Sequence, residues 1–428
     1  MSSSPLPPSC NLPHPMLLKM VTIWSDPKAR LILTGNFLLV VGAGITFMAV
    51  PWLLIQRPNG NAILGYSNAG VTLLILFLLP YFGKIVDRYS RKRVVLAYLG
   101  SAVVLDALIV AVILGDGSTK IWELLTVFCF GSLGASVYYP AQFALSQEVI
   151  APERYESLSG AIEIQWQAGS MLAGALGAWL IAVIPFWGVL CIDAAAYLSA
   201  FLIMSRLQYQ RAQERSMAPA SAWKMLIEGL QYLRGRPRLS VVMLASFLPF
   251  LAIMVGNFLS PIFVREVLRG GPQVYGIGEV SYAVGATLAG LSVPAINARI
   301  GLVPTLLCTI AVYGAAASLN PMAPIAIVFF VSYVLQGWGN AGSRVARTIL
   351  VLKTVPNSVV GRVNLFYSAF ERMLRCTALA LVTAMLPAWG AANSYWVLAV
   401  IAVAAWLMVW SARHVRAYPV EPVTVGES

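Results

Sequence analysis

The sequence predicts an all-α polytopic membrane protein with twelve transmembrane helices in two pseudo-symmetric six-helix bundles. Three observations lead to this class. Of the 428 residues, 59% are hydrophobic and only 11% are charged, whereas an ordinary soluble protein has about 25% charged residues. Apolar runs long enough to cross a bilayer recur along the whole chain. The basic residues stand mostly in the short segments between these runs, where water can solvate them.

The chain divides into five predicted segments. Residues 1–30 form an N-terminal tail and an interfacial segment, in which Ser25-Asp26-Pro27 is a helix start, a capping residue followed by proline. Residues 31–205 form the first bundle, 206–238 a linker, 239–412 the second bundle and 413–428 a C-terminal tail. The twelve predicted spans cover residues 31–55, 63–86, 94–115, 121–141, 158–182, 186–205, 239–263, 273–297, 302–319, 322–345, 360–386 and 394–412.

The lysines and arginines predict the orientation. If the N-terminus is cytoplasmic, most of the 29 basic residues fall on the cytoplasmic side, and the opposite side holds only Arg57, Lys120, Arg265 and Arg269. The positive-inside rule then places both termini in the cytoplasm. We expect a multi-pass protein of the inner (plasma) membrane. The net charge of +12 reflects this topology, and we expect no nucleic-acid partner.

The two halves resemble each other, and an amphipathic segment joins them. Trp223, Leu226, Leu230 and Leu233 recur at helical spacing in the linker, which predicts a helix on the cytoplasmic surface. At one constant offset, Gly65 falls on Gly276 and Arg88 falls on Arg299. Matching halves of this kind are typical of membrane transporters with internal repeats.

The loop Gly83-Lys84-Ile85-Val86-Asp87-Arg88-Tyr89-Ser90-Arg91-Lys92-Arg93 joins the second and third spans. It resembles the loop signature of the major facilitator superfamily, with Ser90 in place of the family glycine. The resemblance implies that Gly83, Asp87, Arg88 and Arg91 form a gate that holds one conformation. The alternative is a solvated charge cluster that only sets the topology.

Further segments are similar to the branch of that superfamily with macrolide efflux proteins and siderophore exporters. They are Pro140-Ala141-x-x-Ala144-Leu145, Ile192-Asp193-Ala194-x-x-Tyr197-Leu198 and Glu228-Gly229-Leu230-x-Tyr232-Leu233. The fifth span contains Gly174 and Gly177, which allow close helix packing. Family antiporters usually have Gly-Pro there, whereas this chain has Ala173-Gly174, so the case for antiport is weaker.

The eleventh predicted span holds the densest group of charges. Glu371 and Arg375 are four residues apart and share one helix face, and Arg372 lies beside them. A charged group at mid-bilayer costs at least ~2.5–3.5 kcal/mol, so these side chains should face protein or a wet cavity. Arg372 and Arg375 are candidates to bind an anionic group of a substrate, and Glu371 is a candidate for proton coupling. The alternative is a self-neutralising pair used for packing.

Four more carboxylates fall within predicted spans. We expect Glu163 to couple protons or to tether an arginine at the cytoplasmic gate. Glu279 is expected to handle substrate or protons, or to pair with Arg265 or Arg269. We expect a structural role for Asp193 and a tether between helices for Asp106. Polar and aromatic side chains on spans that usually line the facilitator cavity complete the candidate substrate site: Asn36, Asn257, Tyr138, Trp166 and Tyr367.

Other classes are disfavoured. The only histidines are His14 and His414, and the five cysteines are scattered, so we expect no metal site, no catalytic triad and no enzyme. No nucleotide-binding loop occurs, and we expect no cofactor. We predict a secondary active transporter, a monomer that exports a small amphipathic or anionic organic molecule against protons. The alternatives are a lysolipid transporter or flippase of the same fold and a non-transporting sensor or assembly protein.

Overall fold

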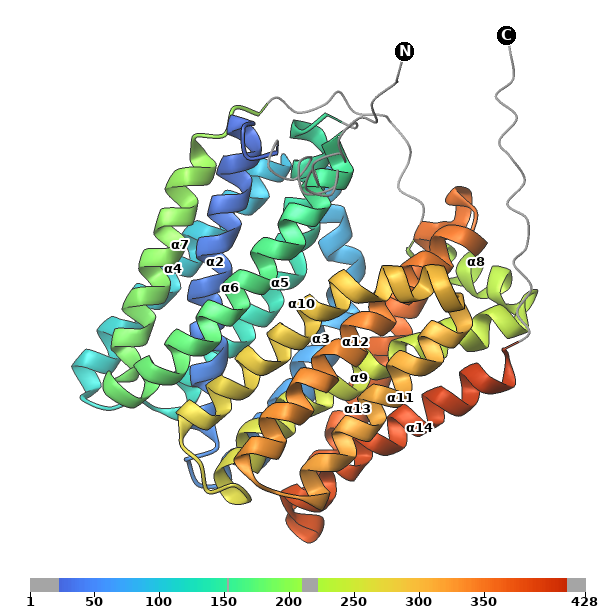
Figure 1. Ribbon diagram of the computed structural model, residues 1–428. Coiled ribbons are helices and arrows are strands. Elements are labelled where there is room, and N and C mark those ends of the chain that lie inside the picture. Colours follow the sequence, from blue (N-terminus) through green and yellow to red (C-terminus); the bar gives the residue numbers. More distant parts are fainter. Residues whose placement is uncertain (1–22, 152–153, 210–221, 414–428) are drawn as a thin grey trace, which may run out of the picture.

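The computed structural model describes residues 23–151, 154–209 and 222–413, and the regular structure within them is helical (Figure 1). Thirteen helices are present in this part of the chain. In chain order they are α2 (Pro27–Leu54), α3 (Gly60–Arg88), α4 (Arg91–Asp116), α5 (Ile121–Val149), α6 (Tyr155–Val183), α7 (Phe186–Ser205), α8 (Ala222–Arg234), α9 (Pro237–Glu266), α10 (Pro272–Ile300), α11 (Leu302–Met322), α12 (Ala326–Thr354), α13 (Asn357–Ser394) and α14 (Trp396–Ser411).

Local sequence explains where the helices start and stop. The Asp26 carboxylate accepts hydrogen bonds from the backbone N–H groups of Lys28 (2.9 Å) and Ala29 (3.4 Å), and Pro27 occupies the first turn of α2. The predicted helix start is therefore confirmed, since these contacts satisfy backbone groups that have no partner inside the helix. Gly390 has φ 72° and interrupts α13 near its end, in a conformation that glycine adopts without strain.

Ten described helices are long and apolar enough to cross a membrane: α2 to α7, α9, α10, α11 and α13. The α14 helix is shorter, with 16 residues, and α12 is more polar. Both belong to the second bundle, where α12 packs on α10 and α11, and α14 packs on α9 and α11. The twelve predicted spans thus correspond to α2–α7 and α9–α14, in agreement with the predicted all-α polytopic class.

The two groups of six helices meet along α3 with α13 and along α6 with α10. They converge at the end where α2 connects to α3 and α9 to α10, and they diverge toward the end where α2 and α9 begin (Figure 1). The buried apolar side chains follow the same pattern. At the converging end one cluster contains residues of both groups, including Trp52, Ala178 and Phe258. At the other end each group has its own cluster, around Val95 in the first and Val409 in the second.

Contacts between the bundles are dense at the converging end. The Arg265 guanidinium donates a hydrogen bond to the carbonyl oxygen of Ile55, and Asn61 Nδ2 donates to Glu266 Oε1 at 2.7 Å. The rings of Trp52 and Tyr275 stack with centroids 6.1 Å apart. These contacts close the space between the bundles on that side.

The linker helix α8 packs on the second bundle. Leu233 is buried in one cluster with residues of α9 and α13, and Glu228 pairs with Arg362 of α13 at 2.9 Å. The side chain of Trp223 lies outside the described residues. The predicted amphipathic helix is present, and Leu233 on its apolar face is buried, whereas Ile227 is exposed.

Candidate functional site

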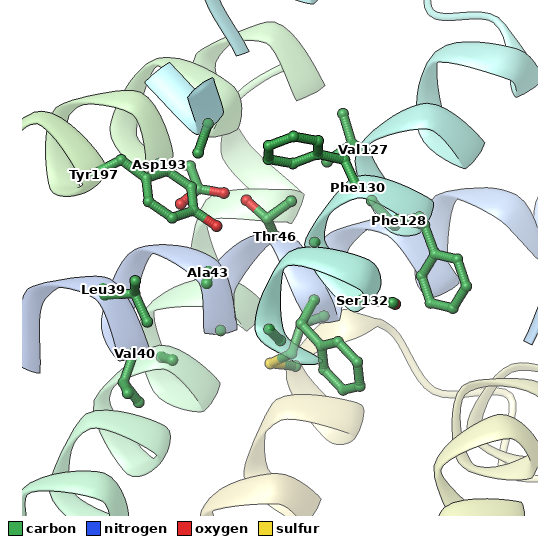
Figure 2. A pocket seen from close by; sticks show the side chains of 18 of the residues that line it. Leu39, Val40, Ala43, Thr46, Val127, Phe128, Phe130, Ser132, Asp193 and Tyr197 are labelled. Carbon is green, nitrogen blue, oxygen red and sulfur yellow. The ribbon is translucent and has the colours of Figure 1, made fainter. Parts of the chain in front are cut away.

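A cavity of about 380 Å³ lies in the first bundle, at the point where that bundle faces α10. Its walls come from α2, α4, α5, α6 and α7, and Glu279 is the one described residue of the second bundle that lines it. Most of the wall is apolar, with Leu39, Phe47 and Val127 among the lining side chains (Figure 2). Its volume is within the range of small-molecule sites, about 300–1,000 Å³.

Aromatic rings form a continuous series along one wall. Trp166 meets Tyr139 edge-on with ring centroids 5.1 Å apart, and Tyr139 meets Tyr138 at 5.5 Å. Tyr138 in turn contacts Tyr98 at 5.3 Å, and Tyr98 contacts Tyr197 at 5.9 Å. The hydroxyls of Tyr98 and Tyr197 are 3.3 Å apart. Such a wall suits a planar or apolar ligand with a few polar groups.

Three carboxylates also line the cavity, one each from α4, α7 and α10: Asp106, Asp193 and Glu279. The two aspartates are each 3% exposed, and Asp106 Oδ2 and Asp193 Oδ1 have no hydrogen-bond donor among the described residues. Figure 2 shows the Thr46 hydroxyl directed toward the Asp193 carboxylate. Glu279 makes no hydrogen bond or ion pair within the described part of the chain. No lysine, arginine or histidine lies among the described residues that form this wall.

Close packing of α2 on α7 holds Asp193 in place. A Cβ atom on Gly42 would lie 2.6 Å from Ala196 Cβ and 2.8 Å from Asp193 Oδ1. Real Cβ atoms do not approach other atoms that closely, so only glycine fits at this position. The glycine brings α2, and with it Thr46, next to the aspartate.

Four of the sequence-predicted site residues line the cavity: Tyr138, Trp166, Gly174 and Glu279. Asn36 lies behind the wall and accepts a hydrogen bond from the Tyr138 hydroxyl at 2.6 Å. Gly174 faces α10, because a Cβ atom there would lie 3.4 Å from Glu279 Cβ. The expected pairing of Glu279 with Arg265 or Arg269 is not formed.

The charged group of α13 lies apart from this cavity. Glu371 and Arg375 form an ion pair of 3.0 Å, with side chains 6% and 18% exposed. Glu371 and Tyr367 line a void of only about 10 Å³, and Tyr367 donates a hydrogen bond to the Ser240 carbonyl oxygen at 3.1 Å. Arg372 lines neither space. The two charges therefore partner each other within α13, while Glu371 Oε1 and Arg375 Nε have no hydrogen-bond partner among the described residues.

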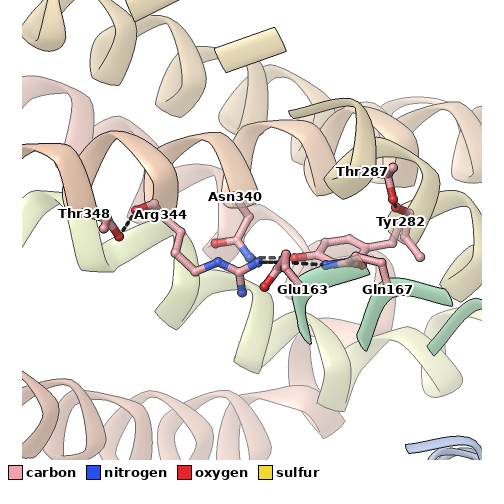
Figure 3. A network of polar contacts seen from close by, with 8 residues as sticks. Glu163, Gln167, Tyr282, Thr287, Asn340, Arg344 and Thr348 are labelled. Carbon is pink, nitrogen blue, oxygen red and sulfur yellow. Dashed lines mark hydrogen bonds and ion pairs between the residues drawn. The ribbon is translucent and has the colours of Figure 1, made fainter. Parts of the chain in front are cut away.

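Glu163 belongs to a polar network between α6 and α12 (Figure 3). Its Oε1 atom accepts from Arg344 and from Gln167, both at 3.1 Å. The side chain of Glu163 is 59% exposed and that of Arg344 is 43% exposed. This pair links the two bundles at the diverging end, as the tether alternative for Glu163 expects, with Arg344 as the partner.

The predicted gate residues lie at the ends of α3 and α4. Arg91 forms an ion pair with Glu148, which also accepts a hydrogen bond from Tyr209. Burial and the Glu148 carboxylate raise the pKa of Tyr209, so that its hydroxyl stays a donor. Arg88 is exposed and Gly83 faces open space, while the side chain of Asp87 lies outside the described residues.

Two further predicted residues lie outside the cavity wall. Gly177 packs against α2, where a Cβ atom would lie 3.3 Å from Met48 Sδ. Asn257 on α9 is half-buried and makes no hydrogen bond within the described chain.

Asp106 and Asp193 are cavity residues that the sequence analysis assigned to structural roles. A span-by-span reading treats α4 as peripheral, yet α4 packs on both α5 and α7 and carries Asp106 to the cavity. The indication was present in the sequence: no other charged residue lies between Arg93 and Asp116. A lone ionisable residue within a span is a functional candidate by default.

Two helical bundles with a cavity between membrane-crossing helices are typical of membrane carriers. The family model described as Major Facilitator Superfamily matches residues 32–296. The chain therefore belongs to this superfamily, and it is a multi-pass membrane protein. The family resemblance drawn from the loop after α3 is confirmed.

Relatives with named functions are distant. The chain is 22% identical over 278 residues to macrolide efflux protein A of Streptococcus pyogenes, a match covering 64% of this chain and 65% of that protein, less than two thirds of its length. It is 24% identical over 423 residues to the enterobactin exporter EntS of Escherichia coli strain K12, covering 96% of this chain and 99% of that protein.

Solved structures share the fold. The nucleoside transporter NupG, as its D323A mutant, superposes with a TM-score of 0.70 at 12% identity, over 91% of this chain and 99% of that one. A bacterial homologue of the iron transporter ferroportin in an inward-facing state gives 0.69 at 15% identity, over the same shares. These likenesses establish the arrangement of the helices.

Proposed function

We propose that this chain is a proton-coupled secondary transporter that exports a small amphipathic organic molecule by alternating access. The observation that carries the proposal is the cavity, in which an aromatic wall and three carboxylates face one space beside the interface of the bundles. Aromatic rings bind the apolar part of such a molecule, and the carboxylates orient its polar part. The named exporters among the distant relatives support efflux as the direction.

We assign the binding of the coupling proton to the carboxylate of Glu279. It belongs to α10, faces the cavity and has no ion-pair partner within the described chain. Glu163 and Glu371, the other two candidates, each have an arginine partner at 3.0–3.1 Å. An unpaired carboxylate at membrane depth requires either a proton or a cation as its partner. Exchange of that proton between the two sides of the membrane would couple its gradient to substrate movement.

In alternating access, the two bundles would rock against each other. This motion would open and close the converging end, which is closed in the structure. In the structure the bundles converge where Arg265 contacts Ile55 and Asn61 contacts Glu266. In the other conformation these contacts would separate, and the diverging ends of the bundles would approach each other. The Glu163–Arg344 pair and the Arg91–Glu148 pair lie on that side.

Flux in proteoliposomes tests the proposal. Three fluorescent amphipathic dyes, a sulfonate, a neutral dye and a quaternary ammonium, would be supplied outside vesicles with an acidic lumen. We expect at least one dye to accumulate against its gradient. The Glu279→Gln variant should lose at least about tenfold of the pH-driven accumulation while it retains downhill flux.

The exposed Asp116, at the far end of α4, offers the control Asp116→Asn, which should behave as wild type. Equal pH-driven accumulation by Glu279→Gln and wild type would remove Glu279 from coupling. If the pH gradient moves none of the three dyes, the proposed function is wrong.

A further inference from the structure

We infer that the cavity binds an amphipathic organic cation whose positive group lies between Asp106 on α4 and Asp193 on α7. The inference rests on the proposed function, since it names the chemical class of the substrate and the side chains that select it. It goes beyond that proposal, which leaves the charge of the substrate open. The four steps that follow concern charge, aromatic contact, size and the exclusion of anions.

The first step is charge. Both aspartates are 3% exposed, and each has a carboxylate oxygen with no hydrogen-bond donor within the described residues. Both side chains line the same cavity, from α4 and α7, two helices that pack on each other. A buried carboxylate without a partner is costly, and two that share a site are costlier still. A cationic ligand would supply the positive charge that the described residues around the two carboxylates lack.

The second step is aromatic contact. Tyr98 and Tyr197 meet edge to face beside the carboxylates, and the ring of Phe130 stacks on Tyr98 at 5.9 Å. The negative face of an aromatic ring attracts a cation within about 6 Å. Beyond these rings the wall is apolar, with Leu39, Phe47 and Trp166. A ligand that is charged at one end and apolar at the other satisfies both parts.

The third step is size, which disfavours a bare metal ion. The cavity holds about 380 Å³, far more than one ion requires. Magnesium and calcium need about six or more oxygen ligands, whereas the pair offers two carboxylates, with the Thr46 hydroxyl directed toward Asp193 (Figure 2). No cluster of three potential metal-ligating acidic, histidine or cysteine side chains occurs in the described ranges. An ammonium or phosphonium group on an organic body fits the space.

The fourth step concerns anions. None of the described residues lining the cavity is basic, so an anionic group would meet only carboxylates. Arg375, the sequence-predicted anion ligand, is paired with Glu371 beside a void of about 10 Å³. Opposite charges attract and like charges cost several kcal/mol across an interface. The cavity therefore selects for positive charge.

Equilibrium binding to the purified full-length chain in nanodiscs tests the inference without any flux. The probe is tetraphenylphosphonium, and the uncharged comparison is triphenylphosphine oxide, which retains three of the rings. Asp106→Asn and Asp193→Asn should each weaken phosphonium binding at least about tenfold, because each removes one buried anionic partner. Binding of the oxide should change less than about twofold. Asp116→Asn, the same substitution at the exposed end of α4, should leave both affinities unchanged.

A second measurement on the unmodified protein covers the case in which the variants do not fold. Dicyclohexylcarbodiimide modifies protonated carboxyl groups in apolar surroundings, and peptide mass spectrometry locates the adducts. We expect saturating tetraphenylphosphonium to protect Asp106 and Asp193, and equal triphenylphosphine oxide to protect them less. Labelling that the phosphonium leaves unchanged would overturn the inference.

The remaining outcomes are also decisive. If the aspartate variants lose affinity for both probes equally, the two side chains have a structural role and the inference is overturned. Displacement of the phosphonium by micromolar Mn²⁺ would assign the pair to a metal ion instead. Phosphonium binding without pH-driven flux would contradict only the proposed transport function. Flux of a neutral or anionic dye without phosphonium binding would contradict only the inference drawn here.

Discussion

At the scale of single residues, the environment of a charge decides its role. Glu371 and Arg375 face each other in protein, whereas Asp106, Asp193 and Glu279 face a cavity without a cation among its described lining. Both groups cost free energy in a membrane. For Glu371 and Arg375, the ion pair between them offsets this cost. The three cavity carboxylates depend on a proton or a ligand to offset it.

The α13 pair leads to a stability prediction. Glu371→Leu leaves Arg375 buried without its anionic partner, and breaking such a pair costs about 3–5 kcal/mol. We expect a marked fall in the apparent melting temperature of the purified protein. The double variant Glu371→Leu/Arg375→Leu removes both charges and should regain most of the loss. A single variant that melts like wild type but no longer transports would instead place the pair in the transport path.

The sequence identified every one of these buried charges, because an ionisable residue within an apolar run is conspicuous. It could assign a partner only within one helix. Glu371 and Arg375 share a helix face, so their pairing followed from spacing alone. Asp106 and Asp193 are 87 positions apart in the chain, and their placement in one cavity depends on how α4 packs on α7 and α7 on α2. That packing rests on side-chain shape, such as the absence of a Cβ atom at Gly42, which periodicity does not encode.

At the scale of helices, α6 and α10 form the closest join between the bundles. A Cβ atom on Gly276 would lie 2.2 Å from Ala178 Cβ and 2.7 Å from the Gly174 carbonyl oxygen. The sequence repeat paired Gly276 with Gly65, and Gly65 has the corresponding place on α3, where a Cβ atom would lie 2.0 Å from Thr383 Oγ1. Both halves therefore use a glycine at the same point to let a helix of the other half approach.

This close approach leads to a prediction for α10. Gly276→Ala should force α6 and α10 apart and destabilise the observed conformation by about 1–3 kcal/mol. Gly290→Ala on the same helix meets no atom within 4 Å and should be neutral or slightly stabilising, since alanine favours helix. Melting temperature of both variants, and thiol-reagent access to a cysteine placed at Asn61, provide the measurements. Identical behaviour of the two variants would contradict the role of Gly276.

At the scale of the whole molecule, the two bundles are in broad contact at one end and diverge toward the other, where the Glu163–Arg344 pair still joins them. The helix count, the division into halves and the linker helix followed from hydropathy and charge, because the bilayer imposes length and polarity on every span. The conformation did not follow, since hydropathy and charge do not encode which end of the two bundles is closed. The contacts of Arg265 and Asn61 at the converging end are visible only in three dimensions.

Those contacts allow a test of the motion. In a chain without native cysteines, Asn61→Cys and Glu266→Cys place two thiols where a 2.7 Å hydrogen bond now joins the side chains. A short bifunctional methanethiosulfonate should join them and reduce dye flux at least about tenfold, and a reductant should restore it. The Glu266→Cys variant alone should be unaffected by the reagent. Full flux in the cross-linked protein would show that this end need not open.

The cavity wall belongs to the first half of the chain except for Glu279. Under the proposed function, the first half of the chain would recognise the substrate, and Glu279 of the second half would bind the coupling proton. Substitutions in the first half could broaden or narrow the range of substrates without altering the coupling to the proton gradient. A transporter arranged in this way could accept new substrates while its proton coupling stays unchanged.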